Sequence, residues 1–178
     1  MKKTYFLVVF IFLIIAACTT KPAADSSAVS IKIDKTTIMP FTDSLKADTF
    51  KVHLTGSTPN NSSLAFTITS FKGIVIYKAS ISGIDMLKNE TAAALKKDSE
   101  RMKFLQNEVN YFFDEEHFLI PAVLPSEKPD KNVPDKAFYE ELKHTALNGF
   151  NFSGEKGVKI YIAWSVKEQK VKVYYKCC

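Results

Sequence analysis

Apolar and polar residues alternate along several stretches of the chain, which is the pattern of half-buried β-strands. In the clearest stretch, Phe50, Val52 and Leu54 occupy one face, while lysine, histidine and threonine occupy the other. A run of glycine, serine, proline and asparagine at 56–63 then predicts a turn. We predict four strands in this half of the chain, of which the last three form an antiparallel meander: 31–33, 50–54, 64–68 and 74–81.

The spacing of apolar residues changes to three and four after Ser82, and this spacing indicates an amphipathic helix. Ser82 or Asp85 can accept hydrogen bonds from the free amides at its start. Asp98 and Ser99 compete for backbone hydrogen bonds within this stretch. The sequence therefore predicts one long helix or two abutting helices, ending near His117.

Prolines recur between 118 and 134, which excludes a helix there and predicts an extended connection over the surface. Pro134 and Asp135 then begin a second helix, and Gly149 stands where a left-handed residue would end it. The predicted buried side of this helix consists of Phe138, Leu142, Ala146 and Leu147.

Two further stretches of alternation, at 158–164 and 171–177, predict two strands at the end of the chain. The predicted order of elements is β-β-β-β-α-α-β-β. This order indicates an α+β fold with a single antiparallel sheet and with the helices packed on one of its faces.

The first residues have a different pattern, with lysines at positions 2 and 3 followed by thirteen residues, 5–17, that carry no charge. Thirteen apolar residues match the core of an export signal and fall short of the ~20 that a membrane-spanning helix needs. The run ends in Ile15-Ala16-Ala17-Cys18, with small residues before a cysteine.

This segment resembles the lipobox of bacterial lipoproteins. The resemblance implies cleavage between Ala17 and Cys18 by signal peptidase II and attachment of acyl chains to Cys18, which binds the protein to a membrane. It divides the chain into a signal peptide (1–17), an acylated cysteine with a small, polar tether (18–28) and one globular domain (29–178).

The residues after Cys18 bear on where such a protein is sorted. By similarity with enteric sorting rules, Thr19 in place of aspartate favours the outer membrane over the inner one. No acidic residue precedes Asp25, which favours the periplasmic face over surface exposure. We therefore expect a lipid-anchored protein of the cell envelope, at the outer membrane and facing the periplasm.

Composition and charge exclude several classes of protein and one class of partner. With 46% apolar and 24% charged residues in 178, the chain has an ordinary globular composition, which excludes collagen-like, disordered and disulfide-scaffold classes. The formal charge of +5 falls to +3 when Lys2 and Lys3 leave with the signal peptide, too little for a nucleic-acid partner. The scattered glycines form no phosphate loop, and we expect no cofactor.

The densest group of titratable residues is Asp114-Glu115-Glu116-His117. On a helix, Asp114 and His117 would share a face, which suggests a small metal-dependent or acid/base hydrolase, with His53 or His144 as a further ligand. A zinc site needs three or four ligands, and no established zinc or nucleophile motif is present. We therefore expect a solvated helix end, no metal site and no enzyme.

Lysines and tyrosines alternate along the two predicted C-terminal strands, at Lys159 and Tyr161 on one and at Lys172, Tyr174 and Lys176 on the other. If the register aligns them, they form a basic surface with two rings, which a surface adhesin or inhibitor could use. The same pattern is typical of the wet face of a half-buried sheet, with lysines protecting an edge.

Cys177 and Cys178 end the sequence. Neighbouring residues of a strand point to opposite faces, so a bond between them would need a strained turn. We expect one buried sulfur and one free terminal thiol, although pairing between molecules or with a redox partner stays open in an oxidising compartment.

The export signal and the lack of a catalytic motif together define the leading hypothesis. It is a lipid-anchored, non-enzymatic periplasmic module that binds an envelope protein or a glycan.

Overall fold

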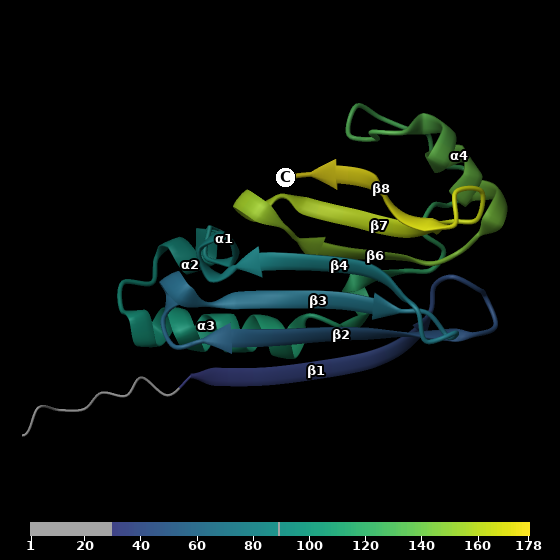
Figure 1. The fold of residues 1–178 in the computed structure, drawn as a ribbon. Helices are drawn as coiled ribbons and strands as arrows, with labels where there is room; N and C mark the ends of the chain where they lie inside the picture. The colour runs from purple at the N-terminus through teal and green to yellow at the C-terminus, as the bar shows by residue number, and fades with distance from the viewer. Residues whose placement is uncertain (1–29, 89) are drawn as a thin grey trace, which may run out of the picture.

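The computed structural model describes residues 30–88 and 90–178 (Figure 1). In this part of the chain, eight strands form two antiparallel sheets of four, each ordered as in the sequence. The first sheet consists of β1 (Ile31–Pro40), β2 (Ala47–Gly56), β3 (Ser63–Thr69) and β4 (Val75–Ser82). The second sheet consists of β5 (Phe118–Leu119), β6 (Gly149–Ser153), β7 (Lys159–Ser165) and β8 (Lys170–Cys177). The signal peptide (1–17) and the tether with Cys18 (18–28) lie outside the described residues.

The α+β class is confirmed, but the single sheet is wrong. The helical segment that follows β4 separates the first four strands from the rest, and the later strands form a sheet of their own. Two strands of this second sheet, β5 and β6, were not predicted. Strand β6 lacks alternation because its first four residues are all buried, covered on both faces of the sheet.

The predicted long helix is divided into three: α1 (Gly83–Met86), α2 (Glu90–Ala93) and α3 (Asp98–Tyr111). The Ser82 side chain accepts a hydrogen bond from the Asp85 amide at the start of α1, as expected for a cap. A break at Asp98 was one of the two predicted alternatives, whereas the break after Met86 and the end of α3 at Tyr111, rather than near His117, were not predicted. Asp98 and Glu100 lie in the first turn of α3, where the helix dipole favours negative charge.

Helix α4 (Lys136–Thr145) begins where predicted, and the Asp135 side chain caps it by accepting a hydrogen bond from the Phe138 amide. Its predicted end is wrong. The left-handed residue after the helix is Ala146, with φ of 51°, and Gly149 instead begins β6. Ala146 is therefore exposed rather than part of the buried side, whereas Leu147 is buried beyond the helix.

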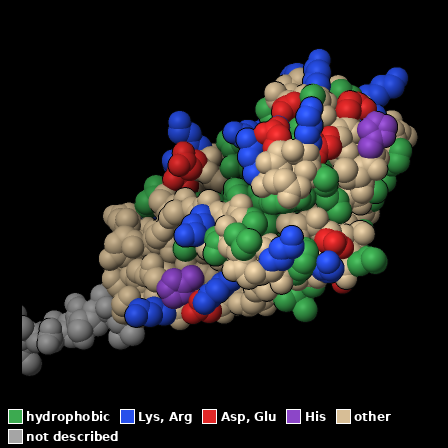
Figure 2. Space-filling model, turned by 45° about the vertical axis from the view of Figure 1, so that its right-hand side comes forward, with side chains coloured by type: hydrophobic (Ala, Val, Ile, Leu, Met, Phe, Trp, Pro, Cys, Tyr) green, Lys and Arg blue, Asp and Glu red, His purple; other side chains and the backbone are tan. Residues whose placement is uncertain are grey.

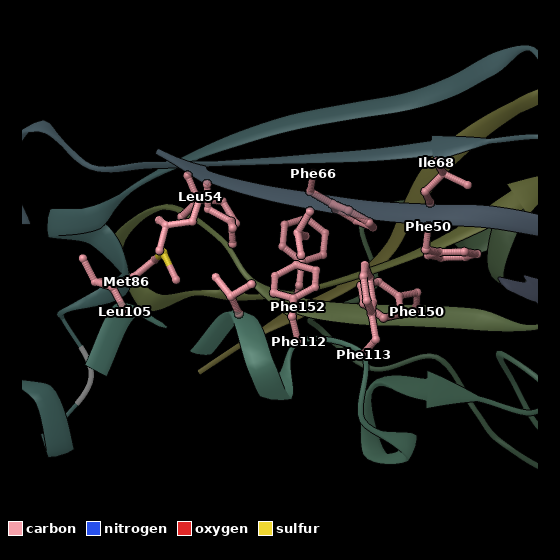
Figure 3. Packing of buried hydrophobic residues seen from close by; sticks show 14 of the residues in the cluster. Phe50, Leu54, Phe66, Ile68, Met86, Leu105, Phe112, Phe113, Phe150 and Phe152 are labelled. Carbon is pink, nitrogen blue, oxygen red and sulfur yellow. The ribbon is translucent and has the colours of Figure 1, made fainter. Parts of the chain in front are cut away.

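The main hydrophobic core lies between the inner faces of the two sheets (Figure 3). The strand register aligns the buried residues of β2 and β3 in pairs: Phe50 with Ile68, Val52 with Phe66, and Leu54 with Leu64. Phenylalanines from both sheets and from the end of α3 meet in the middle of this core. Burial of such large side chains supplies the main favourable free energy of folding.

The helices do not share one face, which corrects the second part of the fold prediction. Helix α3 packs beside β1 and β2, at the main core. Helix α4 covers the opposite face of the second sheet, where it forms a smaller core with the proline-rich segment (Figure 1). The members of this core are Ala122, Val123, Val133, Phe138, Tyr139, Leu142, Ala163 and Tyr174.

Candidate functional site

A hollow of about 460 Å³ opens between α1, the end of α3 and the start of β7. Aromatic and aliphatic side chains form much of its wall: Leu64, Ile81, Met86, Tyr111, Phe112 and Phe152. Ionisable side chains also line it: Asp85, Glu108, Asp114, Glu116, His117 and Lys159. We call this site the acidic hollow, because carboxylates outnumber cationic groups in its lining. An apolar wall with a few converging polar groups is typical of small-molecule sites.

His117 is fixed at the hollow by its own backbone neighbourhood. It ends the 3-10 turn η2 (Glu115–His117), and its Nδ1 lies 2.9 Å from the Asn151 carbonyl oxygen. A carbonyl oxygen only accepts hydrogen bonds, so Nδ1 donates and Nε2 of the neutral ring is left as an acceptor. The ring also stacks on Phe112, with an angle of 9° between the ring planes.

Asn151 holds the η2 turn in place from strand β6. Its side-chain amide donates to the carbonyl oxygens of Glu116, at 3.1 Å, and His117, at 3.3 Å. Asn151 is buried, so these hydrogen bonds are shielded from water. The side chain and the main chain of one residue thereby fix both the position and the tautomer of His117.

Two of the carboxylates at the hollow already have cationic partners. Asp114 lies 3.8 Å from the Lys35 ammonium. Asp85 accepts hydrogen bonds from Lys88 and from the Ser82 hydroxyl, both at 2.6 Å, and these bonds lower its pKa to about 2. Each of these two carboxylates therefore already has a partner within the protein.

Glu108 differs from the other carboxylates of the hollow. Burial raises its pKa above the ordinary value. Within the described part of the chain it has no ion pair, although Lys159 also lines the hollow. Since Tyr111 and Phe112 follow it by three and four residues, the end of α3 presents all three side chains to the same site. Glu108 was not among the predicted site residues, although this spacing is visible in the sequence.

The predicted group at 114–117 is only partly brought together. Asp114, Glu116 and His117 line the hollow, but Glu115 does not. The shared helical face is wrong, because α3 ends at Tyr111 and Asp114 precedes a separate turn. Buried Phe112 and Phe113 draw the chain into the core at this point.

The two other histidines lie elsewhere. His53 lies 3.0 Å from Asp34 on the outer face of the first sheet, and His144 lies on α4. Across residues 30–88 and 90–178, no group of three histidine, cysteine, aspartate or glutamate side chains is arranged to hold a metal ion. The alternative in which either histidine joins His117 at a metal site is therefore not supported by the described part of the chain.

The predicted lysine and tyrosine surface is not formed as expected. Tyr174 is only 3% exposed and belongs to the core under α4, where burial raises its pKa. Tyr161 contacts both Tyr174 and Tyr175, because the register shifts after Tyr161. The face of the second sheet that carries Tyr174 is covered because α4 and the proline-rich segment pack on it.

The lysines predicted for the same surface are separated from one another. Lys172 pairs with Asp135 at 2.8 Å, pairs with Glu168 and lies over the Phe138 ring. Lys159 lines the acidic hollow, and Lys176 is exposed at the far end of β8. They do not form one basic surface.

Cys177 and Cys178 form a disulfide bond, whereas the sequence predicted one buried sulfur and one free thiol. Alternation no longer applies at this point, because β8 ends at Cys177 and Cys178 has a positive φ of 60°. Both sulfur atoms therefore reach the same side of the chain.

The chain matches no protein-family model, no curated protein and no solved structure. No helix in the part of the chain that the structure describes has the length and apolar character needed to cross a membrane.

Replacing Glu108 by glutamine should stabilise the protein at neutral pH. The raised pKa means that the folded protein holds the Glu108 proton more tightly than the unfolded chain does, so ionisation at pH 7 opposes folding. This cost disappears as the pH falls through the folded-state pKa towards the ordinary value of 4.5. We expect Glu108→Gln to raise Tm by about 1–3 °C at pH 7, with little gain near pH 4.

The matched control for this change is Glu115→Gln, which removes an exposed carboxylate outside the hollow. Thermal unfolding followed by circular dichroism at both pH values measures the difference. An equal rise in Tm at pH 4 and pH 7, or the same rise from Glu115→Gln, would contradict the conclusion that burial raises the pKa of Glu108.

Proposed function

We propose that the protein is a lipid-anchored component of the bacterial cell envelope whose folded domain binds a ligand in the acidic hollow. The lipobox-like segment ending in Cys18 supports the anchor. The binding role rests on one observation: Glu108, a half-buried carboxylate without an ion pair in the described residues, lines a hollow with aromatic walls. Leaving a carboxylate partly desolvated costs free energy that a bound cation would recover.

The chemistry of the hollow selects a ligand class. Aromatic and aliphatic walls at Tyr111, Phe112 and Phe152 suit an apolar body, and they offer ring faces that attract a cation. Glu108 suits an ammonium group. We therefore propose a ligand that carries an amine beside an apolar part, presented by an envelope protein or a glycan.

Binding is supported better than hydrolysis by the arrangement around His117. The hollow contains Ser153 as well, but no hydrogen bond within the described residues joins Ser153 to His117. The Nδ1 of His117 is bonded to a backbone carbonyl rather than to a carboxylate. In a Ser-His-Asp triad, the serine hydroxyl bonds to the histidine and a carboxylate orients the other ring nitrogen, and neither contact is formed here.

The test is a titration with hexylamine, with 1-hexanol and hexanoate as neutral and anionic probes of similar length. Chemical shifts of the Ser153 and Gly157 amides, which lie at the hollow, report binding. We expect hexylamine to bind most tightly and Glu108→Gln to weaken it about tenfold or more, the cost of one charge-assisted hydrogen bond. Glu115→Gln should leave the affinity unchanged.

Two outcomes would remove the proposal. Equal affinity for hexylamine and 1-hexanol would show that charge plays no part. Release of hexanol from hexyl acetate by the wild-type protein, and not by His117→Gln, would show that the hollow is hydrolytic.

A further inference from the structure

Three turns meet at one end of the two sheets: 41–46 between β1 and β2, 70–74 between β3 and β4, and 166–169 between β7 and β8. We call them the apolar end. They lie at the opposite end of β1 from the start of the described chain (Figure 1). The length of β1 therefore separates this end from the point at which the described chain begins.

A buried carboxylate holds the first two turns together. Asp48 is fully buried and accepts hydrogen bonds from the Thr42 amide, at 2.6 Å, and the Phe71 amide, at 2.7 Å. The Thr42 hydroxyl donates to the same carboxylate at 2.9 Å. Hydrogen bonds to an ionised acceptor are strong when shielded from water, so the two turns have a defined relative position.

Large apolar side chains project into solvent from all three turns. Leu45 is 91% exposed and Ile74 is 60% exposed. Phe71, Val75 and Val166 are exposed as well. Exposed apolar residues are common singly, but their concentration on adjacent turns indicates a docking surface.

Lysines accompany these apolar tips. The ammonium groups of Lys46 and Lys72 lie over the Phe71 ring, 4.5 and 5.6 Å from its centre. Lys167 and Lys170 extend from the third turn and its edge. Figure 2 shows hydrophobic, basic and acidic side chains intermixed on the side of the molecule that contains this end, and the acidic ones at these turns, Asp43 and Glu168, pair with Lys46 and Lys170. Of the four lysines, Lys72 and Lys167 have no ion-pair partner among the described residues.

We propose that the apolar end docks on a lipid bilayer surface that carries anionic headgroups. Apolar side chains at the tips of turns can enter the boundary between headgroups and acyl chains, which adapts to a convex surface. Each lysine near an anionic surface adds about 1 kcal/mol, and its ammonium can remain among the headgroups. A protein partner would instead need a matching concave surface around tips as exposed as Leu45.

The dimensions permit docking on the membrane that holds the anchor, a step that rests on the proposed acylation of Cys18. The ten residues of β1 span about 33 Å. The ten residues after Cys18 can span about the same distance when extended. An anchored domain can therefore lie along the bilayer with its apolar end in contact.

Trp164 provides a direct probe, because it is the only tryptophan in the chain and lies in a hollow among these turns, beside Phe71 and Val166. The full-length protein is reconstituted into phosphatidylcholine vesicles with about 30% phosphatidylglycerol, made with or without brominated acyl chains. Bromine quenches tryptophan only at short range. We expect at least twofold quenching of Trp164, and markedly less in vesicles of phosphatidylcholine alone.

Paired variants separate docking from mere attachment. Ile74→Ser with Val166→Ser, and separately Lys72→Gln with Lys167→Gln, should abolish most of the quenching, while Lys32→Gln with Lys78→Gln removes two lysines elsewhere and should not. Unquenched wild-type Trp164, or quenching that these variants leave unchanged, would overturn the proposal; the first result would favour a protein partner for the apolar end, and the second would place the bilayer contact on other residues. Fluorescence is measured only on protein that floats with the vesicles. A failure of acylation at Cys18 is detected separately, by the mass of the protein.

Discussion

Replacing Phe66 by alanine should lower the free energy of unfolding by about 3–5 kcal/mol, the range for removing a large aromatic side chain from a packed core. Phe66 is fully buried in the middle of β3. Its ring contacts rings from the first sheet, from the end of α3 and from β6: Phe50, Tyr77, Phe112, Phe113, Phe150 and Phe152. The cavity left by alanine would lie between the two sheets and could not be filled by one neighbour.

Phe71→Ala is the matched control, because it removes the same side chain from an exposed turn after the same strand. Phe71→Ala should lower the free energy of unfolding by about 1 kcal/mol or less. Guanidinium unfolding followed by fluorescence and by circular dichroism measures both changes. Similar losses from the two variants would show that the two sheets do not pack face to face around Phe66.

The strands that the sequence predicted well are those with one covered face. In β2 and β3, core residues alternate with exposed ones, so a period of two is visible. Strand β6 is covered by the main core on one face, and on the other by Ala122 and Tyr174 and by the η2 turn, so it has no such period. Periodicity also contains no information on which strands pair, and for this reason the division into two sheets was not foreseen.

The candidate site was only partly predictable for a similar reason. The spacing of Glu108, Tyr111 and Phe112 on one helix is local and can be read from the sequence. Their meeting with Asp85 and Lys159 depends on how distant elements pack. The predicted exposure of Tyr174 was wrong because alternation along β8 cannot reveal that α4 covers the outer face of the second sheet.

Replacing Cys18 by alanine should abolish attachment of lipid to the protein, because the proposed acyl chains are bound to this sulfur atom. Each buried methylene contributes about 0.8 kcal/mol, so two or more chains hold a protein on a membrane essentially permanently. Metabolic labelling with radioactive palmitate should give a labelled wild-type protein and no signal above background from Cys18→Ala.

The other two cysteines provide the control. Cys177→Ser with Cys178→Ser removes the other two cysteine sulfur atoms of the chain, and this variant should keep the full palmitate label. Label that persists in Cys18→Ala, or is lost only from the C-terminal double variant, would place the lipid elsewhere.

The most direct measurement is the intact mass of the protein purified from the membranes of the cell that makes it. The account predicts a chain that begins at Cys18 and carries the added mass of at least two acyl chains on that residue. A chain that retains Met1, or one that begins at Cys18 without added lipid, would contradict it.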